Sequence, residues 1–158
     1  NEQGRNFTNK IWNALKLVKM WEAKQTASSQ PQATSFAVSW FENRLNEAKL
    51  ELDTMFKEFR LSEALKTIYS LIWDDFCSWY LEWVKPGFEQ PIDQAVYEKT
   101  VSFFEELMQL LHPYMPFITE EIYHELKERA AGDDLTIRQL TPAAAVNKQT
   151  IEAAGLLK

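Results

Sequence analysis

The chain reads LSEALKTIYSLIWDDFCSWYLEWVKP from Leu61 to Pro86, and this stretch decides the fold class. Its apolar side chains recur every three to four residues, which is the period of an α-helix, and they do so on two sides. One stripe is Leu65, Ile68, Ile72, Phe76, Trp79 and Trp83, and the other is Tyr69, Trp73, Cys77, Tyr80 and Val84. A helix that is apolar on two sides is typical of the centre of a helical bundle.

The same period extends over most of the chain and is interrupted by segments rich in Gly, Pro, Ser and Gln. The central helix is predicted to start after an N-cap at Ser62 and to end at Val84, before Lys85-Pro86-Gly87. The other predicted helices span residues 6–24, from a cap at Ser35 or Ser39 to Phe59, from Pro91 to about Leu110, and from Thr119 to Ala130. The sequence therefore predicts an all-α fold, an antiparallel bundle of four or five helices.

This bundle is predicted to occupy residues 1–131, and residues 132–158 are predicted to form a short irregular C-terminal appendage. The helical period is lost after Gly132: residues 135–137 alternate like a short strand, and Thr150 is placed to cap a further helix. A chain of 158 residues, 46% of them hydrophobic, is expected to build one compact domain with a sizeable core.

The net charge of −6 disfavours a general nucleic-acid binder, but the charge is unevenly distributed. From Arg5 to Lys24, the basic side chains face a single carboxylate, Glu22, so the first helix is locally basic. No apolar run is long enough to span a bilayer, and no membrane association is expected. The single cysteine, Cys77, lies in an apolar stripe, which predicts a core residue and is compatible with a reducing cytoplasm.

The sequence contains no pattern typical of an active site. Neighbouring carboxylates such as Asp74 and Asp75 point about 100° apart on a helix and do not form a dyad. Glu121 and His124 have the E-x-x-H spacing of di-iron bundle proteins, but such a site needs a second pair, and none precedes His112. Gly-rich phosphate loops are also absent. We therefore predict no catalytic residue, metal ligand or cofactor site in this chain.

One polar face remains as a candidate binding surface, on the first helix. It lies opposite an apolar stripe and consists of Asn6, Asn9, Asn13 and Lys16, with Lys10 alongside. Asn amides can read base edges, Lys neutralises phosphate, and exposed aromatic rings stack on unpaired bases; the candidate rings are Trp12, Phe36 and Trp40. Alternatively, the Asn side chains bond to neighbouring helices, and the residue chemistry alone favours this alternative.

Three stretches resemble class I valyl-tRNA synthetases. GRNFTNKIWNA at Gly4–Ala14 is similar to the start of that family's anticodon-binding domain. FCSWYLE at Phe76–Glu82, followed by Val84-Lys85-Pro86, resembles its F-C-D-W-Y-L-E…V-K-P signature, with Ser78 in place of Asp. LHPYMPFITEEIY at Leu111–Tyr123 resembles an H-P-x-M-P-F-x-T-E-E corner that isoleucyl and leucyl enzymes share. The first two stretches favour the valyl family.

The resemblance implies a domain that recognises the anticodon stem-loop of valine tRNA and performs no chemistry itself. We expect the tRNA-binding residues to be Arg5, Asn9, Lys10, Asn13 and Lys16, assisted by Trp40 and Arg44 on the next helix. The parent enzyme would be a cytoplasmic, monomeric valine-tRNA ligase that uses ATP and magnesium, with catalytic and editing domains in the same chain. The H-I-G-H and K-M-S-K-S motifs of such catalytic domains do not occur in this sequence. The segment from Thr141 resembles the link to a C-terminal coiled coil.

Other interpretations remain open at this point. The same domain of an isoleucyl-tRNA synthetase differs in tRNA preference. A helical protein-interaction adaptor predicts an exposed apolar patch and no RNA affinity. A metal-dependent bundle enzyme predicts bound iron or manganese and a second acidic-histidine pair.

Overall fold

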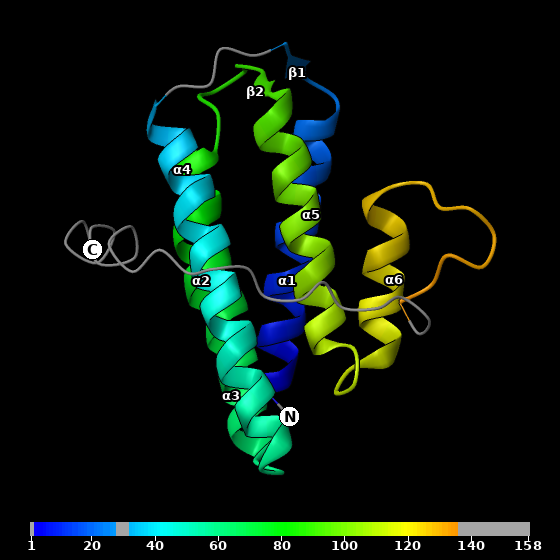
Figure 1. The fold of residues 1–158 in the computed structure, drawn as a ribbon. Helices are drawn as coiled ribbons and strands as arrows, with labels where there is room; N and C mark the ends of the chain where they lie inside the picture. Colours follow the sequence, from blue (N-terminus) through cyan, green and yellow to red (C-terminus); the bar gives the residue numbers. More distant parts are fainter. Residues whose placement is uncertain (1, 28–31, 136–158) are drawn as a thin grey trace. The chain divides into compact units, whose positions relative to one another are not determined.

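The computed structural model describes residues 2–27 and 32–135 and confirms the all-α class (Figure 1). These residues form two units. Unit 1 comprises residues 2–27 and 86–135, and unit 2 comprises residues 32–85. The predicted boundary between a bundle at 1–131 and an appendage at 132–158 stays a prediction. Residues 136–158, which include most of the predicted short strand and the helix predicted at Thr150, lie outside the described residues.

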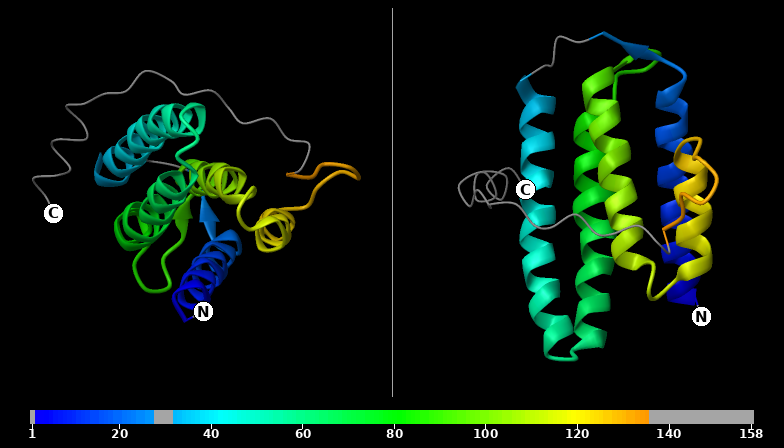
Figure 2. Two further views of the ribbon diagram at one scale, coloured as in Figure 1. Left: turned by 90° about the horizontal axis from the view of Figure 1, so that it is seen from below. Right: turned by 45° about the vertical axis from the view of Figure 1, so that its right-hand side comes forward.

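Unit 1 is built from three helices, α1 (Glu2–Glu22), α5 (Gln94–Leu111) and α6 (Pro116–Leu126). The α1 helix packs against both α5 and α6, and successive helices run antiparallel (Figures 1 and 2). At one end, β1 (Gln25–Thr26) and β2 (Ile92–Asp93) form a parallel pair with Gln25 opposite Ile92. This two-residue pairing, which the sequence did not predict, joins the end of α1 to the start of α5.

The ends of the unit 1 helices differ from the sequence prediction. Pro91 does not open α5; Asp93 caps it, because its Oδ1 accepts a hydrogen bond from the backbone N–H of Val96 at 3.1 Å. Pro116 occupies the first turn of α6, a position where its missing N–H costs nothing. Thr119 is therefore inside α6, where its hydroxyl donates to the Met115 carbonyl at 2.8 Å, and it is not the predicted cap.

Unit 2 is an antiparallel hairpin (Figure 1). One arm is α2 (Gln32–Lys57). The other arm is continuous and consists of α3 (Leu61–Ser70), the π-helical segment η1 (Leu71–Tyr80) and α4 (Leu81–Val84). The end at Val84 is as predicted. The two predicted caps of α2, Ser35 and Ser39, both lie inside that helix, and Arg60, not Ser62, is the N-cap of α3. Arg60 is the N-cap of α3 because its carbonyl accepts the first helical hydrogen bond, from the N–H of Ala64 at 3.1 Å, and its side chain makes no capping hydrogen bond.

Aromatic rings fill the core of unit 2 where α2 faces η1 and α4. Phe41 contacts Phe76 and Tyr80 with ring centroids 5.3 Å apart in both cases, and Phe76 stacks on Tyr80 at 5.7 Å. Each buried aromatic side chain contributes a large apolar area, and tilted ring pairs add to this. Cys77 is 8% exposed, so its predicted place in the core is confirmed.

Candidate nucleic-acid interface

The polar face of α1 is solvent-exposed. The opposite face is buried through Phe7, Ile11, Ala14, Leu15, Val18 and Trp21. Arg5, Asn9, Asn13 and Lys16 are exposed, at spacings of four, four and three residues that keep them on one side of the helix. Lys10 lies beside them and is half-buried. Five of the seven predicted site residues therefore share one helix, in unit 1.

Four of these side chains, all but that of Lys10, have their polar groups available. Among the residues that the structure describes, Arg5 and Lys16 form no ion pair, and the amides of Asn9 and Asn13 make no hydrogen bond. Further along, Lys19 pairs with Glu22 at 2.8 Å, which partly offsets the positive charge at the C-terminal end of α1. The basic and amide groups nearer the N-terminus of α1 are therefore those best placed to meet a polyanion.

Trp40 does not present its ring to solvent, so the expectation that this ring is exposed is wrong. Its side chain is 1% exposed, with the Trp83 ring centroid at 5.5 Å in an edge-on arrangement and that of Phe41 at 6.2 Å. The ring fills the core of unit 2, where α2 meets α4. A base cannot reach its face without unpacking that contact.

Arg44 is held by carboxylates of its own unit. Its Nε donates to Asp75 Oδ2 at 3.0 Å, and its Nη1 donates to Glu47 Oε1 at 2.7 Å. Glu51 Oε1 lies 3.6 Å from the same nitrogen. The guanidinium is 19% exposed and balanced by these negative charges, so a phosphate would be repelled rather than attracted at this position. The structure thus gives Arg44 the role of an ion-pair centre between α2 and η1.

The sequence matches a known protein family. Residues 39–156 match the anticodon-binding domain of tRNA ligases. The chain belongs to this family. It is 49% identical over 157 residues to the valine-tRNA ligase of Parabacteroides distasonis, an alignment that covers 99% of this chain and 18% of that protein. It is 52% identical over 153 residues to the valine-tRNA ligase of Porphyromonas gingivalis, covering 97% of this chain and 17% of that protein.

A more distant relative, the valine-tRNA ligase of Symbiobacterium thermophilum, is 39% identical over 134 residues, or 82% of this chain and 15% of that protein. The chain thus spans less than a fifth of the length of these relatives. The family match begins at residue 39, after the polar face of α1. The alignment with the Parabacteroides protein covers nearly the whole chain and so includes α1.

Two remaining expectations concern membranes and metals. Among the described residues, no helix has both the length and the apolar character needed to cross a membrane.

The acidic residue that approaches His124 is not Glu121, as the E-x-x-H spacing suggested, but Glu120 one residue earlier. Asp134 joins this pair from the loop after α6, an approach that the sequence pattern did not indicate.

Proposed function

We propose that this anticodon-binding domain is the tRNA-recognition part of a valine-tRNA ligase and binds the anticodon stem-loop of valine tRNA. The observation that carries the proposal is the identity of about half of the residues with valine-tRNA ligases over nearly the whole chain. The aligned region extends over residues that precede the family match and therefore covers α1.

The exposed face of α1 supplies the contacts. Bases of a single-stranded loop can be splayed out and read on their edges, whereas an A-form stem offers mainly backbone and 2′-hydroxyl groups. Asn9 and Asn13 carry amides with donors and acceptors for base edges. Lys16, Lys10 and Arg5 neutralise phosphates on either side. We leave Trp40 and Arg44 out of this surface, because the Trp40 ring is buried in unit 2 and Arg44 is held by carboxylates of its own unit.

The parent enzyme joins valine to its tRNA with ATP and magnesium in domains outside this chain. In this proposal the chain contributes no catalytic group and holds neither ATP nor magnesium. Its partners are valine tRNA and the catalytic and editing domains of the same polypeptide, in a monomeric cytoplasmic enzyme. Discrimination of valine from near-isosteres belongs to the editing chemistry of the parent and not to this domain.

The test is binding of the 158-residue chain to the anticodon stem-loops of valine, isoleucine and leucine tRNAs at two salt concentrations. Tightest binding to the valine loop, weakening with salt, is expected, because phosphate contacts release counterions. Tightest binding to the isoleucine loop would reassign the domain to an isoleucine enzyme. Absence of binding to all three loops at low salt would contradict a recognition role for this chain and favour a helical adaptor.

A further inference from the structure

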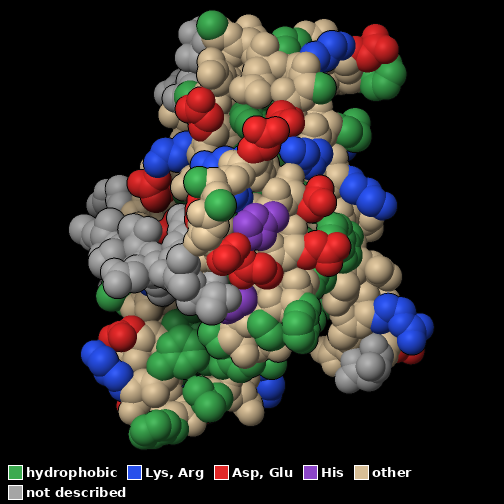
Figure 3. All heavy atoms as spheres, turned by 90° about the vertical axis from the view of Figure 1, so that its right-hand side faces the viewer, with side chains coloured by type: hydrophobic (Ala, Val, Ile, Leu, Met, Phe, Trp, Pro, Cys, Tyr) green, Lys and Arg blue, Asp and Glu red, His purple; other side chains and the backbone are tan. Residues whose placement is uncertain are grey.

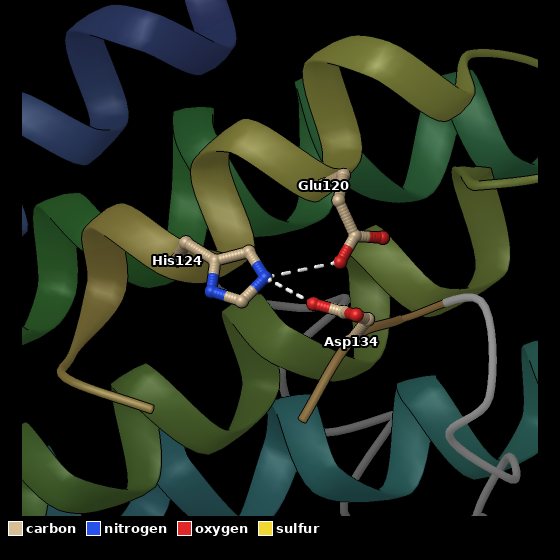
Figure 4. A group of neighbouring side chains, drawn as sticks. All are labelled: Glu120, His124 and Asp134. Carbon is tan, nitrogen blue, oxygen red and sulfur yellow. Dashed lines mark hydrogen bonds and ion pairs between the residues drawn. The ribbon is translucent and has the colours of Figure 1, made fainter. Parts of the chain in front are cut away.

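Three potential metal ligands meet in unit 1. Glu120 and His124 lie one turn apart on α6, and Asp134 comes from the loop that follows this helix (Figure 4). His124 Nε2 is 3.1 Å from Glu120 Oε1 and 2.8 Å from Asp134 Oδ1. All three ligand atoms lie within 4.8 Å of one another. In Figure 4, one imidazole nitrogen faces both carboxylates.

The loop that carries Asp134 is held in place by contacts independent of this cluster. The Tyr123 hydroxyl donates to Asp133 Oδ1 at 2.6 Å. Arg129 donates to the Tyr123 carbonyl through Nε at 3.2 Å and through Nη2 at 2.8 Å, and it also pairs with Glu105. Asp134 therefore does not need a ligand to bring it to α6. A preorganised set of donors loses less entropy on binding than a loose one.

Glu120 has an unused acceptor. Its Oε1 accepts the backbone N–H of Leu135 at 3.0 Å and also meets His124. Its Oε2 is buried and, among the described residues, has no hydrogen-bond partner. In Figure 4 this second oxygen points away from His124 and Asp134, and Oε1 is the oxygen placed to ligate an ion. The site is also reachable from solvent, because the side chains of His124 and Asp134 are 40% and 48% exposed. Histidine and acidic side chains lie at the surface on the face shown in Figure 3.

We propose that Glu120, His124 and Asp134 bind one divalent transition-metal ion, with zinc as the best fit. One imidazole nitrogen and two carboxylate oxygens are a ligand set that zinc accepts, with water in the fourth position of a tetrahedron. An imidazole ligand disfavours calcium and magnesium, which prefer oxygen ligands. The ion would lie between the three side chains and replace the two hydrogen bonds that His124 Nε2 makes to Glu120 and Asp134 in this structure.

The role of such an ion is structural. It joins α6 to the loop that follows it and acts in addition to the contacts of Tyr123 and Arg129. Because the ligands come together only in the folded chain, binding stabilises the folded state in proportion to the logarithm of the free metal concentration.

The test is calorimetric titration of the metal-free 158-residue chain with zinc chloride, together with thermal unfolding with and without zinc. Saturable uptake of one ion per chain and a rise in melting temperature are expected. His124→Gln and Asp134→Asn should each weaken zinc binding by about tenfold or more, because each removes a ligand. Circular dichroism of each variant without zinc verifies that its helices are formed.

Two matched controls separate this site from adventitious binding. Glu121→Gln removes an exposed carboxylate from the same helix, and His112→Gln removes the other histidine of the chain; neither should change zinc affinity. Uptake that is absent, that does not saturate, or that persists unchanged in His124→Gln and Asp134→Asn overturns the proposal. A loss of affinity in His112→Gln equal to that in His124→Gln overturns it as well.

Discussion

Glu105 and Arg129 form a buried ion pair that fastens the segment after α6 to α5. The guanidinium Nη1 of Arg129 donates to Glu105 Oε2, and the two side chains are only 4% and 8% exposed. The guanidinium carbon also lies 3.6 Å from the centroid of the Tyr123 ring, so a cation–π contact accompanies the pair. The same guanidinium donates to the Tyr123 carbonyl, which ends the last turn of α6.

Breaking this pair should destabilise the fold. Glu105→Leu leaves the positive charge of Arg129 buried without its carboxylate, and we expect a loss of about 3–5 kcal/mol in the free energy of unfolding. Urea denaturation followed by circular dichroism measures this loss. Glu125→Leu, at an exposed position of α6, should change the free energy of unfolding by less than about 0.5 kcal/mol. Equal effects of the two substitutions would show that the pair does not stabilise unit 1.

Phe59 ends α2 in a conformation that favours glycine. Its φ is 59°, and two hydrogen bonds close the helix around it: Arg60 N–H to the Met55 carbonyl at 2.8 Å and Phe59 N–H to the Phe56 carbonyl at 3.1 Å. This is the Schellman pattern, in which the left-handed residue is usually glycine. The Phe59 ring is 85% exposed and gains little from packing.

Phe59→Gly should therefore stabilise the chain by about 1 kcal/mol, because it removes the strain of a left-handed side chain. The urea midpoint of unfolding measures the gain. Phe59→Ala removes the same exposed ring but keeps the Cβ atom, so it should bring no comparable gain. If Phe59→Ala stabilised as much as Phe59→Gly, removal of the exposed ring and not relief of backbone strain would be the cause.

The helices could be predicted from the apolar period, but several of their ends could not. Pro91 and Pro116 look alike in sequence, yet only Pro116 lies in the first turn of a helix. The residue after Pro91 donates its N–H to the carbonyl of Lys24 at 3.0 Å, and this contact between distant segments places a strand there instead. The end of α2 at Lys57 likewise depends on the left-handed Phe59, where the sequence offers no glycine.

The candidate surfaces were predictable to different degrees. The exposed face of α1 follows from one helix and its period, so Asn9, Asn13 and Lys16 lie where the sequence placed them. The burial of Trp40 against Trp83 depends on contacts between α2 and α4 that no local pattern reveals. The cluster of Glu120, His124 and Asp134 was missed for a geometric reason. Glu120 and Glu121 lie four and three positions before His124, and both spacings make them neighbours of His124 on a helix. The sequence does not reveal that the loop brings Asp134 to the side of His124 where Glu120 lies.

Trp40 should matter for stability and not for RNA contact. Trp40→Ala should lower the free energy of unfolding by about 3–5 kcal/mol, because it leaves a cavity in the aromatic core of unit 2. Trp40→Phe keeps a ring in the core, should cost less, and should leave the stem-loop affinity of the folded protein unchanged. Denaturant unfolding and stem-loop binding measured on the same preparation test both statements. A folded Trp40→Phe variant with strongly weakened RNA binding would restore Trp40 as a contact residue.

The Glu22 carboxylate should contribute stability only when it is charged. The hydrogen bond from Lys19, and then that from the Tyr97 hydroxyl at 3.0 Å, hold the pKa of Glu22 below its usual value of 4.5. Its contribution is therefore present above the pKa of the unfolded chain and is lost as the pH falls through the lowered value. Because Glu22 is 44% exposed, we expect Glu22→Gln to cost only about 0.5 kcal/mol near pH 7.

This cost should shrink as the pH is lowered below about 4.5, where the carboxyl of the wild-type unfolded chain becomes protonated. Urea unfolding of the two proteins at neutral and acidic pH measures the difference. A Glu22→Gln penalty that stayed constant or grew on acidification would have the opposite sign to that required by the lowered pKa.

Charge reversal on α1 should weaken RNA binding and its salt dependence together. Each lysine that neutralises a phosphate releases counterions, so its loss lowers the slope of log affinity against log salt by about one. Lys16→Glu and Lys10→Glu are expected to weaken binding to the valine stem-loop severalfold and to flatten this slope. Lys66→Glu, an exposed lysine on α3, changes the net charge by the same amount and serves as the control. Fluorescence anisotropy across a salt series measures both quantities.

If Lys66→Glu weakened binding as much as Lys16→Glu, the effect would come from net charge, and the α1 surface would lose its support. If affinity fell with Lys16→Glu but the slope stayed unchanged, Lys16 would not contact a phosphate.

Asn9→Ala and Asn13→Ala should leave the slope unchanged and reduce the preference for the valine loop, because amides read bases and carry no charge.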